Sequence, residues 1–362
     1  RNSERQFPVL GWSYAAPLKP FFLDWIGEFP LLSITGDTGS GKTSTMQLLW
    51  GAFGMDSDPF SAGETPHAQL MQFSASDGVP VWSDEYRPTD MKKSRVDNFR
   101  DLARKCTRGA SKSKGKQDQS TVTYRITSPI VVTGEQRFSD PSLLRRSITV
   151  KFTDSATKEP ETRRAYSKLA GESYEGADGD FHHPDPVDLG AHAFEYYRCL
   201  TRKDREELKR TWHECQADVQ QILSEEGITN PHNSERKAIT TVLFGLRMYQ
   251  DFAESFGVNP PLDAVNVDEE VRDSLVYIAT STGDKTGRGR SHLEEFIETT
   301  ARASMEGYLE KGEHYTLVHG NSQLRINLAR SYDKVKRYHR DHDLDSDIFS
   351  KQEYLDRIED AV

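Results

Sequence analysis

The chain has 362 residues, of which 35% are hydrophobic and 29% are charged, and its formal net charge at pH 7 is −10. This length predicts two or three domains, and the absence of any run of about 18 apolar residues argues against a membrane-spanning protein. The three cysteines lie far apart, without a CxxC pair. Their spacing predicts a reduced, cytoplasmic setting with no disulfide framework or structural zinc. Because the chain begins at Arg1 and not at methionine, we expect it to be part of a longer polypeptide.

The charge is unevenly distributed, with a basic segment inside an acidic chain. Residues 86–152 contain 16 Lys and Arg against 6 Asp and Glu, a local net charge of +10, so the remaining residues carry −20. Local clustering of cations matters more than the total when the partner is a phosphate backbone. This segment is therefore a candidate for nucleic-acid contact.

The first predicted elements surround a glycine-rich motif. An aromatic-rich segment at 7–28 is expected to form a helical lead-in, followed by a buried strand at 31–35 and a helix at 44–50. Between this strand and helix, residues 36–43 read GDTGSGKT and match the GxxxxGK[ST] phosphate-binding loop, or P-loop. The strand before the motif and the helix after it are the context that the motif requires.

The chemistry of this loop predicts a nucleotide site. Its glycines allow backbone N–H groups to turn inward around a polyphosphate, and the following helix adds the positive end of its dipole. Lys42 is expected to reach the β- and γ-phosphates, and the Thr43 hydroxyl is expected to bind Mg²⁺. The alternative is a plain turn between a strand and a helix. The predicted nucleotide-binding residues are Gly36, Asp37, Thr38, Gly39, Ser40, Gly41, Lys42 and Thr43.

A second acidic motif follows one helix later. After the capping residue Thr65, a helix is expected to run to about residue 76, and the strand predicted at 79–85 ends in Asp84 and Glu85. In a nucleotide hydrolase the first of two such carboxylates holds Mg²⁺ and the second polarises the attacking water. The alternative is a surface acidic pair at a strand end.

The next segment is basic and contains alternating lysines. A helix is predicted at 92–106 and a loop at 108–119, in which Lys112, Lys114 and Lys116 alternate with small residues before a strand at 121–126. Such a loop can approach a phosphate backbone closely, with contacts that are independent of sequence and sensitive to salt. The alternative is a solvated loop without a ligand.

Two further buried strands, at 129–133 and 147–152, complete the expected α/β core with a mainly parallel sheet. Thr133 ends the first of them, where its hydroxyl could contact the γ-phosphate or orient water, or have no special role. Arg145 and Arg146 precede the second strand. A guanidinium from a neighbouring subunit can stabilise the charge of a transferred phosphoryl group, whereas the alternative is a solvent-facing basic pair.

Beyond residue 154 the pattern becomes helical, with helices expected within 191–200, 208–223 and 234–252 and an acidic loop at 171–188. A hairpin at 315–318 and 324–328 and a basic helix at 331–340 suggest a small winged-helix-like module. We therefore expect a nucleotide-binding core with its helical lead-in at 1–155, a helical lid at 156–260, a linker region at 261–290 and a C-terminal helix and hairpin module at 291–362.

Taken in order, these motifs resemble those of AAA+ ATPases, with residues 36–43 as Walker A, Asp84 and Glu85 as Walker B, Thr133 as sensor 1 and Arg145 or Arg146 as arginine finger. More narrowly, residues 102–116, Tyr124-Arg125 and the run Val132-Thr133-Gly134-Glu135 are similar to the helicase domain attached to primases in plasmids, phages and integrated elements. In that family a basic insertion before the sensor strand forms a hairpin that faces DNA in the pore of a ring. The resemblance covers about 12–152. The usual sensor asparagine is absent, and Arg236 is either a sensor 2 or a plain surface arginine.

The resemblance implies an ATP- and Mg²⁺-dependent helicase module that forms a ring, with a hexamer expected, and moves on single-stranded DNA or RNA during replication of a mobile element or virus. A primase domain is expected in the same polypeptide. The alternative is an ATP-dependent oligomeric switch or defence NTPase without helicase activity. A further alternative is that the C-terminal basic segment makes the main nucleic-acid contact. Its residues are Arg325, Arg330, Lys334, Lys336, Arg337 and Arg340.

Overall fold

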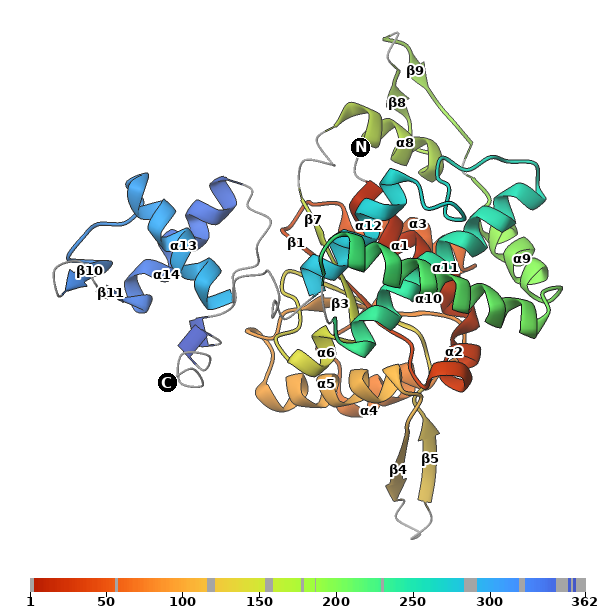
Figure 1. Cartoon of the computed structure of the whole chain (residues 1–362), viewed down its shortest axis with the longest axis horizontal. Helices are drawn as coiled ribbons and strands as arrows, with labels where there is room; N and C mark the ends of the chain where they lie inside the picture. The colour runs from red at the N-terminus through yellow and green to blue at the C-terminus, as the bar shows by residue number, and fades with distance from the viewer. Residues whose placement is uncertain are drawn as a thin grey trace. The chain divides into compact units, whose positions relative to one another are not determined.

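The computed structural model of the chain describes residues 3–55, 58–115, 121–153, 159–176, 179–185, 187–228, 231–282, 292–318, 323–342, 351–352 and 354–355. These residues fall into two units, Arg1–Gly283 and Asp284–Val362. Figure 1 shows the helices and strands of both units with their labels.

The first unit is built around a five-stranded sheet in which every neighbouring pair of strands is parallel. The strands, in their order across the sheet, are β2 (Phe60–Ser61), β3 (Val81–Tyr86), β6 (Ile130–Gly134), β1 (Leu31–Gly36) and β7 (Ser147–Phe152). The α/β fold with a parallel sheet that the sequence predicts is confirmed. Because parallel strands end at the same edge, the residues after β1, β3 and β6 meet there.

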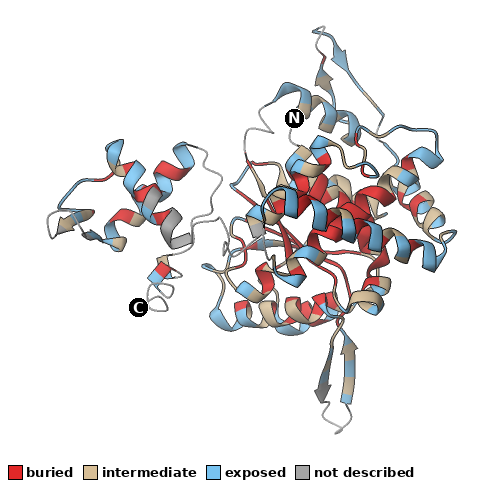
Figure 2. Cartoon of the chain, in the orientation of Figure 1, coloured by how far each residue is buried: buried red, intermediate tan, exposed pale blue. Residues whose placement is uncertain are grey.

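Strand residues bury alternate side chains in two separate cores, one on each face of the sheet. Leu32 and Ile34 of β1 belong to one hydrophobic cluster, whereas Leu31 belongs to the other. In β6 the same alternation places Val131 in the first cluster and Val132 in the second. A sheet covered on both faces requires strands that are apolar throughout, which is why these strands appear as continuous hydrophobic runs in the sequence. The buried strands lie between helices in Figure 2.

Different helices cover the two faces of the sheet. One face is covered by α4 (Pro66–Phe73), α5 (Lys93–Thr107) and α6 (Pro141–Leu144). The other is covered by the N-terminal helices and by most of the later helical region. These elements are α1 (Ser3–Ala15), η1 (Ala16–Leu18), α2 (Lys19–Ile26), α3 (Lys42–Ala52), α9 (Leu189–Leu200), α10 (Arg205–Glu225), α11 (Asn233–Ser255) and α12 (Glu269–Thr282).

The N-terminal lead-in packs mainly against the later helices α11 and α12, as well as against the sheet. Two glycines allow α1 and α11 to cross closely. A Cβ atom added to Gly245 would lie 1.7 Å from the Gly11 carbonyl oxygen, and one added to Gly11 would lie 2.4 Å from the Val242 carbonyl oxygen. No side chain fits at this crossing. Glycine at both positions therefore allows the N-terminal helix α1 to pack directly against α11.

The segment predicted as a loop at 108–119 differs from the expectation, because Ser111–Gly115 forms strand β4. It pairs antiparallel with β5 (Thr121–Arg125), from Ser111 opposite Arg125 to Gly115 opposite Thr121. A run of lysines and small residues has little intrinsic strand preference, and here the hydrogen bonds to β5 supply it. The hairpin projects beyond α4 and α5 in Figure 1.

Residues after the sheet include two features that the sequence did not suggest. Helix α8 (Pro160–Ala170) has no buried residue, and the predicted acidic loop contains a short hairpin of β8 (Tyr174–Glu175) and β9 (Phe181–His182). The range 261–290, predicted as a linker region, contains α12, which packs against α1 and α11. The most glycine-rich part of that range, 283–290, lies outside the described residues.

The second unit contains α13 (His292–Met305), the antiparallel pair β10 (Tyr315–Val318) and β11 (Gln323–Ile326), and α14 (Leu328–Asp341). The predicted hairpin and basic helix are confirmed as elements. Val335 and Tyr338 of α14 pack with Phe296 and Ala303 of α13 in a small core.

Across both units, none of the helices in the described ranges combines the length and the apolar character needed to cross a bilayer.

Candidate nucleotide-binding site

The P-loop joins β1 to α3 at the carboxyl edge of the sheet. Gly36 has φ +154°, and a Cβ atom there would lie 2.4 Å from the Phe152 carbonyl oxygen and 2.7 Å from the Ser40 hydroxyl oxygen. Gly41, at φ +85°, is the N-cap of α3, and no side chain caps this helix. The first N–H groups of α3 are therefore left for an anion, and the helix dipole favours one.

Lys42 folds back onto the loop that carries it. Its Nζ donates hydrogen bonds to the carbonyl oxygens of Gly36 and Asp37 at 2.7 and 2.8 Å and lies 3.3 Å from the Ser40 hydroxyl. Burial lowers the pKa of Lys42, and the carboxylates around it, Glu135 first, act in the opposite direction. The ammonium group is thus held at the loop by weak neutral acceptors that a phosphate could replace.

Asp84 is oriented by hydrogen bonds that both end on its Oδ1. The Thr133 hydroxyl donates to this oxygen at 2.5 Å, and the Glu85 N–H donates to it at 2.7 Å. Thr133 is fully buried at the end of β6 and accepts a hydrogen bond from Trp82 Nε1 at 2.8 Å. Because a hydroxyl has a single proton, Thr133 directs that proton to Asp84.

Glu85 lies in an unusual backbone conformation. Its φ is +60°, and the pairing of β3 with β6 is irregular between Ser83 and Tyr86. A left-handed conformation costs a residue with a side chain about 1–3 kcal/mol, and such residues cluster at functional sites. The Glu85 side chain is exposed and lines the cavity beside the P-loop.

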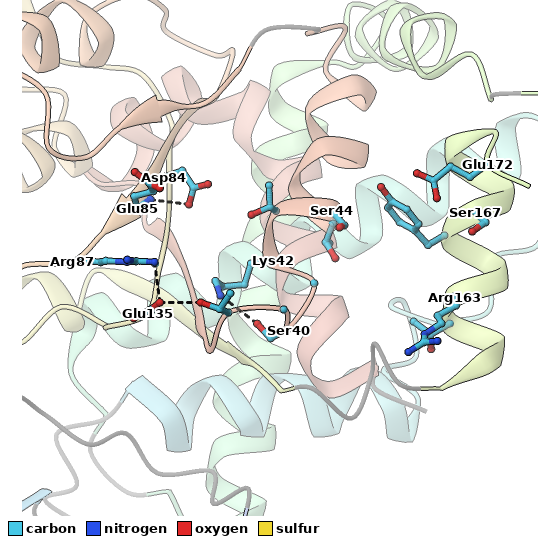
Figure 3. Close-up of a pocket in the computed structure, with 18 residues that line it drawn as sticks. Ser40, Lys42, Ser44, Asp84, Glu85, Arg87, Glu135, Arg163, Ser167 and Glu172 are labelled. Carbon is cyan, nitrogen blue, oxygen red and sulfur yellow. Dashed lines mark hydrogen bonds and ion pairs between the residues drawn. The ribbon is translucent and has the colours of Figure 1, made fainter. Parts of the chain in front are cut away.

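The sequence did not identify Arg87 as a site residue and gave no role to Glu135. The carboxylate oxygen Oε1 of Glu135 lies 2.9 Å from the Arg87 guanidinium and accepts a hydrogen bond from the Thr38 hydroxyl at 3.1 Å. In Figure 3, Arg87 and Glu135 lie on the same side of the loop as Asp84 and Glu85. The signal that could have identified them is their position just after the ends of β3 and β6.

Helix α8 provides the other wall, giving a cavity of about 700 Å³. This volume lies within the range of small-molecule sites, about 300–1,000 Å³. Arg163, Ser167 and Glu172 approach from this side in Figure 3, and Thr162 and Tyr166 also line the cavity. No local pattern in the sequence links this helix to the P-loop.

Arg145 and Arg146 lie at the opposite edge of the sheet from the P-loop. They precede β7, whose first residue, Ser147, pairs with Leu31 at the start of β1. Arg146 donates to the carbonyl and hydroxyl oxygens of Ser142 at 2.7 and 2.6 Å and lies 3.6 Å from Glu28. Neither arginine is among the described residues that line the cavity.

The candidate nucleic-acid residues are separate from the cavity. Lys112 on β4 lies 4.0 Å from Asp101 of α5, and Lys114 pairs in register with Val122, whereas Lys116 lies outside the described residues. Arg236 is exposed in the first turn of α11 and is not among the residues that line the cavity in the described part of the chain. The basic residues of β11 and α14 belong to the second unit.

Solved structures that are similar to this chain include two at low sequence identity. A structure described as the SCCmec type IV Cch active helicase is 15% identical with a TM-score of 0.48, and the match covers 98% of this chain and 63% of that one. This chain thus spans less than two thirds of that protein. The apo C-terminal region of NrS-1 is 14% identical with a TM-score of 0.29, over 72% of this chain and 68% of that one. No family model and no curated protein sequence matches the chain.

Proposed function

We propose that this chain is an ATP-hydrolysing module of the AAA+ type that forms a ring, expected to be hexameric, and moves on single-stranded nucleic acid as a helicase. The observation that carries the proposal is the convergence of the P-loop with Asp84 and Glu85 on one cavity. Nucleotide hydrolysis needs a site that binds the polyphosphate, which the uncapped N-terminus of α3 offers. It also needs carboxylates for the metal and the attacking water, and Asp84 and Glu85 lie at a nearby strand end.

The P-loop residues suit the binding of ATP, which is the substrate in this proposal. The loop N–H groups would surround the phosphates, and Lys42 would exchange its carbonyl acceptors for phosphate oxygens. Thr43 and Asp84 would hold Mg²⁺, which would neutralise negative charge on the phosphates. Since the hydrogen bonds from Thr133 and from the Glu85 N–H both end on Asp84 Oδ1, we regard Thr133 as the residue that positions this carboxylate.

Glu85 is the proposed general base. It would accept a proton from the water that attacks the γ-phosphorus, so that ATP and water give ADP and inorganic phosphate. Its exposed carboxylate beside the metal-binding position suits this role, and the hydrogen bond from its own N–H to Asp84 couples the two residues.

Arg145 and Arg146 support the proposal that the active site is completed by a second copy of the chain. Their place at the far edge of the sheet suits a contribution to a neighbouring subunit's cavity, as in a head-to-tail ring. Arg146 is tied within its own subunit to Ser142 and Glu28, so its loss should disturb the subunit as well as any interface.

Nucleic-acid binding is proposed for the β4–β5 hairpin with Lys112, Lys114 and Lys116. The hairpin projects from the sheet and lies within the segment of local charge +10. Contacts of this kind would follow the phosphate backbone and would weaken steeply with salt. Attachment to a primase, a role in replication of a mobile element or virus, and a cytoplasmic location belong to the same proposal.

The test is the ATPase rate measured with and without single-stranded DNA, combined with the particle mass in the presence of ATP. We expect DNA to stimulate turnover and ATP to favour an oligomer. A rate unchanged by DNA at low and moderate salt, with an intact oligomer, would favour the rival function, an ATP-dependent switch that does not move on DNA. A chain that hydrolyses ATP at full rate as a monomer would contradict the proposed ring.

A further inference from the structure

Arg87 and Glu135 form an ion pair that is attached to the P-loop. The Arg87 Nη2 atom lies 2.9 Å from Glu135 Oε1, and that same oxygen accepts the hydrogen bond from the Thr38 hydroxyl. A single carboxylate oxygen therefore connects the end of β6 to the loop and also holds the arginine. Figure 3 shows this chain of contacts beside Lys42.

This ion pair would be weakened by a triphosphate in the cavity. The Glu135 carboxylate is bound to the loop that surrounds phosphates, so bound polyphosphate would repel it and attract Arg87. Both side chains remain about two-fifths exposed, 44% for Arg87 and 40% for Glu135. Exposed pairs contribute little net stability, whereas a guanidinium can bind two phosphate oxygens at once. The exchange of carboxylate for phosphate is thus favoured by charge and by geometry.

The position of the pair indicates which phosphate it would meet. Arg87 follows β3, the strand that carries Asp84 and Glu85, and Glu135 follows the neighbouring strand β6. All four residues line the same cavity, on the side where the proposed function expects the γ-phosphate. Burial lowers the pKa of Lys42, and among the charges around it Glu135 opposes this shift most strongly while Arg87 adds to it. The charges of Glu135 and Arg87 thus act on Lys42 in opposite directions.

We propose that Arg87 contacts the γ-phosphate of ATP within its own subunit and that Glu135 holds it aside until the nucleotide binds. This inference rests on the proposed ATPase function and adds a residue to it. It predicts that Arg87 distinguishes a triphosphate from a diphosphate, a task separate from that of the arginines expected from a neighbouring subunit.

The test compares the affinities of the full chain for AMP-PNP and for ADP, both with Mg²⁺. Arg87→Gln should weaken AMP-PNP binding at least tenfold and ADP binding less than threefold, since a charge-assisted bond to the γ-phosphate is lost. Glu135→Gln should tighten AMP-PNP severalfold, because the competing carboxylate is removed. The matched control is Arg198→Gln, which removes an arginine of similar exposure that pairs with Glu195 at 2.5 Å in α9. It should change neither affinity.

Equal losses of AMP-PNP and ADP affinity in Arg87→Gln, or no loss, would overturn the inference. So would a Glu135→Gln variant that loses AMP-PNP affinity as Arg87→Gln does, since the ion pair itself would then be required. A wild-type chain that binds neither nucleotide would refute the proposed function and the inference together. If the wild-type chain binds both nucleotides and Arg87→Gln still distinguishes AMP-PNP from ADP as the wild type does, the inference alone would be refuted.

Discussion

The Asp84 carboxylate receives the Thr133 hydroxyl and the Glu85 N–H at the same oxygen. Thr133 is itself fixed by Trp82, whose indole N–H donates to its hydroxyl oxygen inside the core. The orientation of a residue proposed to bind metal thus depends on a buried chain of hydrogen bonds. Residues that orient metal ligands commonly affect metal affinity even though they do not touch the ion.

Replacing Glu85 with Gln should separate nucleotide binding from turnover. The amide keeps the size of the side chain but cannot accept the proton of the attacking water, so we expect ATP affinity within about threefold of wild type and turnover reduced by at least about 10²-fold. Equilibrium binding and steady-state phosphate release measure the two quantities. Normal turnover in this variant would show that Glu85 is not the base.

Replacing Thr133 with Val should weaken Mg²⁺ dependence, with Thr133→Ser as the matched control. Valine removes both the donor to Asp84 and the acceptor for Trp82, so the Mg²⁺ concentration for half-maximal ATPase should rise about tenfold. The free energy of unfolding should fall by about 1–3 kcal/mol because the buried indole N–H of Trp82 loses its acceptor. Serine keeps the hydroxyl and should behave nearly as wild type. A valine variant with unchanged Mg²⁺ dependence would assign Thr133 a purely structural role.

At the scale of whole elements, the β4–β5 hairpin and the α1–α11 crossing are both defined by backbone contacts, through strand pairing in the first and close helix packing in the second. The β4–β5 hairpin presents a basic segment on a narrow pair of strands, with Lys112 near Asp101 at its base. The α1–α11 crossing joins segments more than 200 residues apart through contacts that only glycine allows.

Changing Lys112, Lys114 and Lys116 together to Gln should abolish DNA stimulation of the ATPase while the basal rate remains. Loss of these cations should also make DNA binding less sensitive to salt. The slope of the logarithm of the binding constant against the logarithm of the salt concentration should decrease by about 0.7 per lost phosphate contact on a single strand. The comparison set is Lys334, Lys336 and Arg337 changed to Gln on α14. If that set loses DNA stimulation and the hairpin set does not, the main nucleic-acid contact lies on α14.

Gly245→Ala should destabilise the first unit strongly. Its Cβ atom would lie 1.7 Å from the Gly11 carbonyl oxygen, so the two helices must move apart, and overpacking of this kind costs about 1–3 kcal/mol or more. Gly190→Ala in α9 is the matched control, because the nearest atom to its added Cβ lies 3.4 Å away and its φ is not positive. Thermal unfolding should show a large decrease in Tm only for Gly245→Ala. Similar Tm values would show that the crossing tolerates a methyl group.

For the whole molecule, the placement of the proposed catalytic groups on opposite edges of one sheet has a consequence for assembly. The P-loop follows β1, whereas Arg145 and Arg146 precede β7 beside the start of β1. In a head-to-tail ring each proposed site would combine one edge of a subunit with the opposite edge of its neighbour. Hydrolysis would then depend on assembly and not on the monomer alone.

Mixing two inactive variants tests this arrangement. Glu85→Gln keeps the arginines, and Arg145→Ala keeps the base, so mixed rings should regain activity at about a quarter of their interfaces when the variants are combined equally. ATPase activity of the mixture, against each variant alone, is the measurement. The same experiment with Arg146→Ala identifies which arginine acts across the interface. Failure of both mixtures to regain activity, with mixed oligomers present, would place the arginines outside the active site.

The local sequence was sufficient for the central strands, for the loop between β1 and α3, and for the position of Asp84 and Glu85 at the end of β3. Each of these depends on near neighbours: apolar runs on a sheet buried on both faces, glycines at turns, and polar residues where strands end. Strand β4 was not predictable from residues 111–115, because its conformation comes from pairing with β5. The segment preceding the hairpin strands, α5, was predicted correctly from its own composition and periodicity.

The sequence by itself determined that a P-loop α/β core is present and which residues could bind a triphosphate, since those motifs are contiguous in the chain. Only the tertiary structure decided that Arg87 and Glu135 meet at Thr38, that α8 closes the cavity, and that Arg145 and Arg146 lie away from it. The physical reason is that these contacts join segments separated by tens to more than a hundred residues. Their proximity comes from the order of parallel strands in the sheet, which no local pattern encodes.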